Sequence, residues 1–274
     1  MLKNSFRHQG MIYEFKWAKR QEVLAQMPKY LHLRVETYFN KVLSGKIPYL
    51  LFDDKKILRC SAFRVKGLKR GAQVKISQYL VESGLVMEFF PESEKAKSLP
   101  IHENLKSLPG LVQESYDEYV ELGYKNYKPG HDAVLSRILL QDEGALSVET
   151  PVWLQKQSNL NPYLKKNNPD ELLSFTFRKS ITGHIDLLLY DPSDQSLVIA
   201  DYKPEGHFLR SLPQIASYGL MLKRIMQLKQ VKCLSFRKED AWIYDPEIIR
   251  AQIEKQIVEN GNPKLSWRSL LRTL

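Results

Sequence analysis

Residues 183–203 read GHIDLLLYDPSDQSLVIADYK, and this stretch decides the fold of the second half of the chain. Two short runs within it, IDLLLYD and SLVIADYK, are rich in apolar, β-branched and aromatic residues, which is typical of buried strands. The four residues PSDQ between them have the composition of a turn. The stretch therefore predicts an antiparallel hairpin.

The register of this hairpin decides where its acidic side chains point. With a loop of two or four residues, Asp191 faces Ser196, and Asp186 then lies directly across from Asp201 on the same face, with Cβ atoms about 5 Å apart. A loop of three or five residues would place the two carboxylates on opposite faces. In the first register Lys203 shares the face of Asp201.

Two carboxylates and an ammonium group would then converge at one end of an apolar hairpin. Neighbouring carboxylates repel each other and raise each other's pKa. A divalent cation would relieve this repulsion, and oxygen ligands suit Mg²⁺ or Mn²⁺. The alternative interpretation is a salt bridge of Lys203 with Asp201 or Asp186 at an exposed hairpin end.

The composition is that of an ordinary globular protein. The 274 residues are 43% hydrophobic and 26% charged, which suffices for one large or two modest domains. The chain shows neither the apolar region of a signal peptide nor the roughly eighteen uncharged residues of a membrane span, so we expect a cytoplasmic protein without a membrane partner. The two cysteines, Cys60 and Cys233, have no metal-ligand spacing and indicate no disulfide framework.

The net charge of +10 is concentrated in the N-terminal part. Residues 1–80 carry a surplus of 12 positive charges, whereas residues 81–274 carry a deficit of 2. Such a surplus attracts polyanions and makes nucleic acid the natural partner, although lysines that only keep a protein soluble would give the same count. We expect DNA contacts from five basic residues: Arg59, Arg64, Lys66, Lys69 and Arg70.

The N-terminal part predicts helices followed by a small β meander. Residues 14–44 show helical spacing with a break near Pro28. Residues 47–90 contain four short runs, YLLF, ILRCSAFRV, QVKISQYLV and LVMEFF, that have the texture of strands separated by turns. Residues 91–110 include three prolines and are typical of a linker. We therefore expect a smaller, basic α+β domain over residues 1–110 that binds nucleic acid.

Residues 111–274 predict an α/β domain. We expect helices over residues 112–124, 130–141, 214–227 and 246–258, a strand over residues 146–154, and a strand pair at KCLSF and AWIYD. A polar loop rich in Asn and Pro follows residue 154. The hairpin would lie in the centre of a mixed sheet with helices on both faces.

Several residues follow one another in an order that resembles a known family. The motif GHID (183–186) is followed by DYK (201–203), and then by Gln214 and Tyr218 at positions i and i+4 of the next helix. This order resembles the PD-(D/E)XK nuclease superfamily, in particular its RecB-type exonuclease branch. The resemblance covers about residues 112–244.

Two upstream features also look like this branch: Gly130-His131 at the start of a helix, and Glu149 in the run VETPV. The resemblance implies a restriction-endonuclease-like fold, with a mixed sheet flanked by helices, over residues 111–274. Relatives in this branch often hold an iron–sulfur cluster on four cysteines. Because this chain has two cysteines, no iron–sulfur cluster is expected.

The resemblance also implies a metal-dependent nuclease that hydrolyses phosphodiester bonds of single- or double-stranded DNA. The residues that look like its metal ligands are Asp186, Asp201, the carbonyl of Tyr202, His131 and Glu149. Both aspartates and the glutamate would thereby be catalytic. Mg²⁺ or Mn²⁺ is the implied cofactor, which would activate the attacking water.

The remaining implied roles concern the substrate. Lys203 would orient the attacking water or stabilise developing charge. Gln214 and Tyr218 lie one turn apart and would position the strand that is cut. Lys223 and Arg224 on the same helix are candidates for phosphate contacts.

A non-catalytic DNA-binding or scaffold protein on a nuclease fold is the alternative, since a fold does not guarantee chemistry. Retention of Asp186, Asp201 and Lys203 argues against it. An RNA substrate is a third interpretation that the residues do not exclude. The sequence leaves open endonuclease against exonuclease action, and a protein partner in a repair, mobile-element or defence complex.

Overall fold

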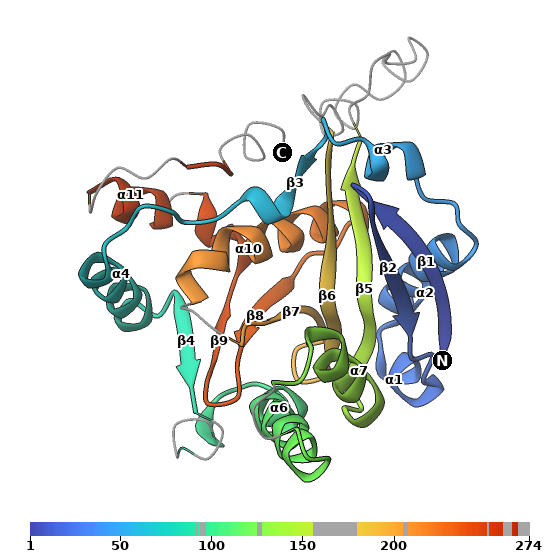
Figure 1. Cartoon of the computed structure of the whole chain (residues 1–274), viewed down its shortest axis with the longest axis horizontal. Coiled ribbons are helices and arrows are strands. Elements are labelled where there is room, and N and C mark those ends of the chain that lie inside the picture. Colours follow the sequence, from blue (N-terminus) through green and yellow to red (C-terminus); the bar gives the residue numbers. More distant parts are fainter. Residues whose placement is uncertain are drawn as a thin grey trace.

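The structure is a computed structural model that describes residues 1–90, 93, 97–124, 128–155, 180–204, 208–250, 252–259 and 265–267. Among these residues nine strands form one sheet in the order β1-β2-β5-β6-β7-β8-β9-β4, with β3 paired to β6 (Figure 1). The strands are β1 (Leu2–His8), β2 (Met11–Trp17), β3 (Leu58–Arg59), β4 (Val86–Phe89), β5 (Ala145–Leu154), β6 (Ile181–Asp191), β7 (Ser196–Tyr202), β8 (Val231–Phe236) and β9 (Ala241–Tyr244).

Helices flank this sheet. They are α1 (Gln21–Gln26), α2 (Lys29–Leu43), α3 (Tyr49–Asp53), α4 (Arg70–Glu82), α6 (Glu103–Glu121), α7 (His131–Gln141), α10 (Phe208–Ile225) and α11 (Gln252–Glu259), with the short 3₁₀ helices η1 (Cys60–Ala62) and η2 (Pro246–Ile249). None of the helices in the described ranges is long and apolar enough to cross a membrane.

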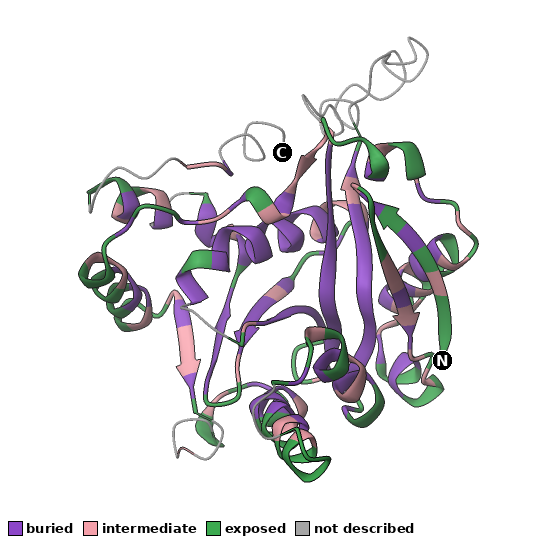
Figure 2. Ribbon diagram, in the orientation of Figure 1, coloured by how far each residue is buried: buried purple, intermediate pink, exposed green. Residues whose placement is uncertain are grey.

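The hairpin of β6 and β7 lies in the middle of the sheet and has the predicted register. Asp191 pairs with Ser196 across a four-residue loop, and the pairing continues to Leu187 opposite Ala200. Every residue of both strands is buried (Figure 2), which explains their nearly continuous apolar runs. The expectation of an α/β fold with a mixed sheet flanked by helices is confirmed.

Two hydrophobic cores cover the two faces of the sheet. One contains buried residues of α6 and α7 together with Leu187 and Val198, and the other contains residues of α2 and α10 together with Ile185 and Ile199. Helix α10 carries the chain from β7 to the neighbouring parallel strand β8. This crossover positions the start of α10 next to the end of the hairpin (Figure 1).

The first 110 residues do not form the expected β meander. QVKISQYLV lies within α4 and YLLF within α3, whereas residues 14–17, expected to be helical, belong to β2. Short apolar runs fit a buried helix as well as a strand, and in α4 the buried residues Ile76 and Leu80 are four positions apart, as in a helix. The prediction of strands in these runs was wrong.

The N-terminal strands are part of the central sheet. β2 pairs with β5, β3 with β6 and β4 with β9. The expected boundary after residue 110 lies inside α6, so the predicted linker is helical from residue 103 onward. A separate N-terminal sheet is therefore a wrong expectation, because these strands complete the sheet that carries the hairpin.

The other expected elements of the second half are present with small shifts. The predicted strand over residues 146–154 is β5, and KCLSF and AWIYD form β8 and β9. Helix α10 begins six residues before the expected start and contains Pro213 in its interior. The expected polar loop after residue 154 lies almost entirely outside the described residues.

Candidate metal centre

Asp186 and Asp201 meet where the pairing of β6 with β7 ends. They are the next residues beyond Leu187 and Ala200, and their carboxyl groups are close enough for each to shift the pKa of the other. Lys203 Nζ lies 2.9 Å from Oδ1 and 2.7 Å from Oδ2 of Asp201. The structure thus brings the three side chains together as the hairpin register predicts.

Burial controls the charge of this pair. The exposed fraction is 8% for Asp186 and 2% for Asp201. Burial, reinforced by the charge of Asp186 and opposed by Lys203, raises the pKa of Asp201 to about 7. Burial also opposes ionisation of Asp186, but its hydrogen bond and charge interaction with His131 and the charge of Lys203 hold its pKa below the ordinary range. Of the two carboxyl groups, Asp201 is therefore the one that holds a proton more readily.

His131 approaches the pair from the start of α7. Its Nε2 lies 3.2 Å from Asp186 Oδ2. Burial alone would lower the pKa of His131, but the hydrogen bond and charge of Asp186 outweigh it and raise this pKa to about 8. Gly130 precedes the helix in an extended conformation, so the chain turns into α7 directly at the centre.

Glu149 reaches the centre from β5 through an unusual backbone conformation. Its φ is 52°, in the left-handed region that non-glycine residues rarely adopt, at a cost of about 1–3 kcal/mol. It lies between Val148, paired with Leu187, and Thr150, paired with Ile185. Its side chain is buried, and Oε2 has no hydrogen-bond partner among the described residues. Burial and then the charge of Asp186 raise the pKa of Glu149 to about 8.

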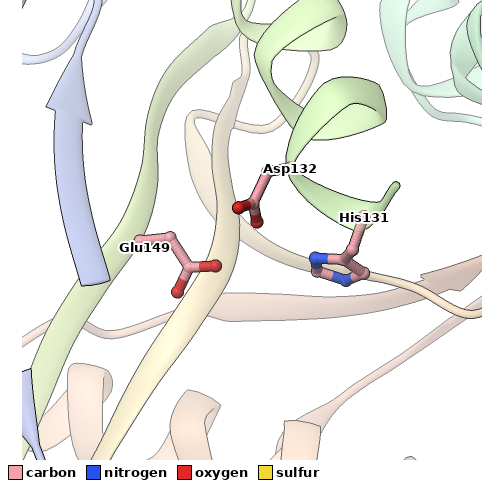
Figure 3. Close-up of side chains that lie close together, drawn as sticks. All are labelled: His131, Asp132 and Glu149. Atoms are coloured by element: carbon pink, nitrogen blue, oxygen red, sulfur yellow. The ribbon is translucent and has the colours of Figure 1, made fainter. Parts of the chain in front are cut away.

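Two groups of side chains in the described ranges have ligand atoms close enough to share a metal ion. One comprises His131, Asp132 and Glu149, which gather from the start of α7 and from β5 (Figure 3). The other comprises Glu149, His184 and Asp186. In each group all ligand atoms lie within 4.8 Å of one another. Sequence reasoning missed Asp132 and His184, although both are adjacent to or within the motifs that it used.

Asp186 separates two sides of this centre. We call Asp201, Lys203 and His131 the lysine side. We call Glu149, His184 and His8 the histidine side; there His184 Nε2 lies 3.5 Å from Glu149 Oε2, and His8 Nδ1 lies 3.3 Å from His184 Nδ1. His8 belongs to β1, 176 residues away in sequence from His184, so no local pattern could have revealed it.

Tyr202, Gln214 and Tyr218 surround the aspartates without being exposed. Tyr202 Oη contacts Tyr116 Oη of α6 at 3.1 Å, and the Tyr202 ring lies beside that of His131 with centroids 5.8 Å apart; the carbonyl of Tyr202 as a metal ligand stays a prediction. Gln214 Nε2 donates to Tyr218 Oη at 3.1 Å, and both side chains are buried in α10. Their contact with a DNA strand stays a prediction.

Gly183 has to be a glycine because of Tyr218. A Cβ atom added at Gly183 would lie 2.4 Å from Tyr218 Cε1, closer than such atoms approach. The aromatic ring of Tyr218 therefore packs directly against the backbone of β6, three residues before Asp186. This contact gives a physical reason for the glycine in the GHID motif.

Of the five basic N-terminal residues expected to contact DNA, two lie near the metal centre and three are exposed near the start of α4. Arg59 pairs in register with Thr182 of β6 and donates to Tyr13 Oη at 2.7 Å, beside the histidine side. Arg64 lies close enough to Lys203 for its charge to oppose protonation of the lysine. The other three are exposed before or at the start of α4: Lys66, Lys69 and Arg70.

Lys223 and Arg224 lie in the last turn of α10, about nine residues or 13 Å along the helix from Gln214. Lys223 Nζ is 3.3 Å from Glu247 Oε1. Burial lowers the pKa of Arg224. The structure does not bring these two residues to the metal centre.

Comparisons of the chain with protein-family models, with curated proteins and with solved structures found no match. The function therefore has to be argued from the geometry of the centre.

Proposed function

We propose that this chain is a divalent-cation-dependent deoxyribonuclease with a restriction-endonuclease-like core, which hydrolyses phosphodiester bonds of DNA with an activated water. One observation carries the proposal. Two buried carboxyl groups from neighbouring strands, Asp186 and Asp201, lie next to each other at a point where the ammonium group of Lys203 is 2.7 Å from Asp201 Oδ2. This combination of groups is the one that metal-assisted phosphodiester hydrolysis needs.

The residues present fit a cation. Three carboxyl groups are buried together, and the Oε2 atom of Glu149 has no hydrogen-bond partner among the described residues. Burying such groups without compensation is costly, and a divalent cation would replace the protons that Asp201 and Glu149 otherwise retain. Asp186, Asp201, His131, Glu149 and the carbonyl of Tyr202 would hold it. Oxygen ligands with one imidazole suit Mg²⁺ or Mn²⁺.

When bound, the cation would supply an acidified water and offset charge on the phosphoryl oxygens. The other steps fall to the chain's own side chains. Burial opposes protonation of Lys203, but the charges of Asp201 and Asp186 outweigh it and raise its pKa, so the lysine stays an ammonium group. Lys203 therefore donates to a phosphate oxygen and stabilises its charge, and it does not act as a base.

The contact between His131 and Asp186 depends on whether His131 carries a proton. Without a cation, His131 carries a proton that it shares with Asp186. Loss of that proton frees an imidazole nitrogen as a ligand, which only the neutral ring provides. The start of α7 thereby contributes a group that responds to whether the aspartates hold protons or a cation.

DNA as the substrate is supported by the distribution of charge. The surplus of 12 positive charges in residues 1–80 belongs to elements that join the central sheet and so lie on the same body as the centre. Arg59 and Arg64 lie close to it, where they would contact phosphates next to the scissile bond. The exposed residues Lys66, Lys69 and Arg70 would extend this contact along the strand.

The test is cleavage of supercoiled, linear double-stranded and single-stranded DNA in Mg²⁺ or Mn²⁺. The wild-type protein is expected to cut at least one of these substrates, and Asp201→Asn, purified in parallel, is expected to cut none. Equal cleavage by both proteins would identify a contaminant. DNA binding without any cleavage would favour the non-catalytic alternative. The products from circular and linear DNA also distinguish endonuclease from exonuclease action.

A further inference from the structure

The histidine side has the geometry of a cation site of its own. The distance of 3.5 Å between His184 Nε2 and Glu149 Oε2 is too long for a good hydrogen bond. Two ligand atoms that are each about 2.1 Å from one cation and about 90–110° apart are separated by about 3.0–3.5 Å. Asp186 adds a third ligand atom within 4.8 Å of the other two. The spacing fits a shared ion better than a direct contact.

Glu149 provides an independent reason to place a ligand here. The residue is 9% exposed, and its Oε2 atom, which faces His184, has no hydrogen-bond partner among the described residues. A buried polar atom without a partner costs free energy, so its retention needs a compensating contact. A cation between Oε2 and His184 Nε2 supplies that contact.

The hydrogen bonds behind His184 prepare its Nε2 atom for a metal. His8 Nδ1 lies 3.3 Å from His184 Nδ1, and His8 Nε2 lies 3.0 Å from Thr182 Oγ1. If His184 Nδ1–H donates to His8 Nδ1, then His8 Nε2–H donates to Thr182, and the lone pair of His184 Nε2 is directed at Glu149. Metal-binding histidines are typically held in this way, by a donated bond from the second ring nitrogen.

Aromatic rings fix the orientation of both imidazoles. The ring of Tyr13 packs on His184 with centroids 4.1 Å apart, and Phe52 meets His8 edge-on at 5.0 Å. Arg59 donates to Tyr13 Oη and so holds this ring in place. The β1–β2 hairpin, together with α3, therefore builds a rigid wall around the histidine side.

We propose that Glu149, His184 and Asp186 bind a second divalent cation, of the first-row transition-metal class and best represented by Mn²⁺, and that His8 is a positioning residue for His184. Imidazole nitrogen favours Mn²⁺ over Mg²⁺, which prefers oxygen ligands. The inference rests on the proposed function and deepens it, because the two ions would share Asp186 and Glu149 between the two sides of one centre. Two cations about 4 Å apart can bind the attacking and the leaving oxygen.

The test counts Mn²⁺ ions bound to the metal-free protein, by the loss of the electron paramagnetic resonance signal of free Mn²⁺ during a titration. The wild-type protein is expected to bind two ions per chain. His184→Gln is expected to bind one, on the lysine side, and Asp201→Asn is expected to bind one, on the histidine side. The double variant is expected to bind none.

His8→Phe keeps all three ligands and a ring at position 8 but removes the acceptor of His184 Nδ1. It should weaken Mn²⁺ binding on the histidine side about 10- to 100-fold, the usual cost of losing the group that holds a metal-binding histidine. Binding on the lysine side should not change. His32→Phe alters a histidine on α2 that contacts only Glu36 among the ion pairs of the described residues; it is the matched control and should leave both affinities unchanged. If His184→Gln does not fold, the comparison of these two variants still tests whether the histidine side binds a cation.

The outcomes separate this inference from the nuclease proposal. A single Mn²⁺ that Asp201→Asn removes, or unchanged binding of two ions by folded His184→Gln or His8→Phe, overturns the second site and leaves the nuclease proposal standing. Two ions with the expected variant pattern but no DNA cleavage supports the second site and removes the nuclease. No Mn²⁺ binding at all overturns both.

Discussion

The two sides of Asp186 differ in how their buried charges are balanced. On the lysine side, Asp201 has the ammonium group of Lys203 at 2.7 Å, and Asp186 has His131 at 3.2 Å. On the histidine side, Glu149 faces His184, whose pKa burial lowers to about 4, so its neighbour is a neutral ring. The acids of the lysine side are in contact with positively charged side chains. The acid of the histidine side, Glu149, has a neutral imidazole as its neighbour.

This difference indicates how the centre can be stable before a metal binds. The ion pairs of the lysine side keep Asp186 and Asp201 in place without a cation. Glu149, like Asp201, holds a proton more readily than an ordinary carboxyl group, since burial and the charge of Asp186 raise its pKa to about 8. We infer that a metal ion on the lysine side would take over contacts that the acids make with Lys203 and His131. On the histidine side it would give Glu149 Oε2 the partner that this atom lacks among the described residues.

Asp186→Asn should have the largest effect, because Asp186 belongs to both sides. Loss of its charge is expected to reduce the initial rate of DNA cleavage by about 10³-fold or more, corresponding to several kcal/mol of transition-state stabilisation. The rate is measured with a labelled oligonucleotide in Mn²⁺, alongside circular dichroism to verify the fold. A rate within tenfold of wild type in a folded variant would contradict the role of both sides.

Lys203→Met tests the lysine side alone. It removes the ammonium group without removing a metal ligand, so cleavage should fall by about 10²- to 10³-fold while the Mn²⁺ stoichiometry is retained. Lys203→Arg is the control and should recover part of the rate, since it restores the positive charge. Loss of Mn²⁺ binding in Lys203→Met would instead show that the lysine maintains the site and does not act on the substrate.

Gly183→Ala disturbs the packing of Tyr218 against β6, three residues before Asp186. The new Cβ would meet the ring of Tyr218 at 2.4 Å, and overpacking of this kind costs about 1–3 kcal/mol of unfolding free energy. Chemical denaturation measures this cost. The cost should shrink in a Tyr218→Leu background, because the ring that causes the clash is gone. An equal cost in both backgrounds would show that the strain arises elsewhere.

The smallest expected effect concerns the pH dependence of stability in EDTA. The pKa values of Asp201 and Glu149, about 7 and 8, exceed their ordinary values, so the folded state binds more protons than the unfolded state below these pH values. His131, with its pKa raised to about 8, loses its stabilising contribution over the same range. Thermal stability should therefore fall by several degrees from pH 6 to pH 8.5.

Mn²⁺ should remove most of this pH dependence, because the cation replaces the protons that the acids lose. Differential scanning calorimetry at both pH values, with and without Mn²⁺, makes the measurement. The stabilisation by Mn²⁺ should be larger at pH 8.5 than at pH 6. A larger stabilisation at pH 6 would mean that the acids are already ionised there without a metal ion, which contradicts the raised pKa of Glu149.

The sequence predicts the lysine side and Glu149, but not the two histidines of the histidine side, for a physical reason. Asp186, Asp201 and Lys203 are linked by one short hairpin, in which only the loop length decides the register and so the face of each side chain. His8 reaches His184 only because β1 and β2 extend the same sheet from the other end of the chain. Pairing between distant strands has no local signature.

The N-terminal elements show the same limit at the level of secondary structure. The alternating Val74 and Ile76 of QVKISQYLV fit a strand, but tertiary packing selects a helix that buries Ile76 and Leu80. The φ of 52° at Glu149 has no sequence signal either, since non-glycine residues adopt it only when surrounding contacts require it.

The most direct test of the metal centre is anomalous diffraction near the manganese edge from crystals soaked in Mn²⁺. The account predicts a peak within about 2.5 Å of carboxylate oxygens of both Asp186 and Asp201, and a second peak between Glu149 and His184 about 4 Å away. Ordered side chains at saturating Mn²⁺ with no peak beside Asp186 and Asp201 would contradict the central claim.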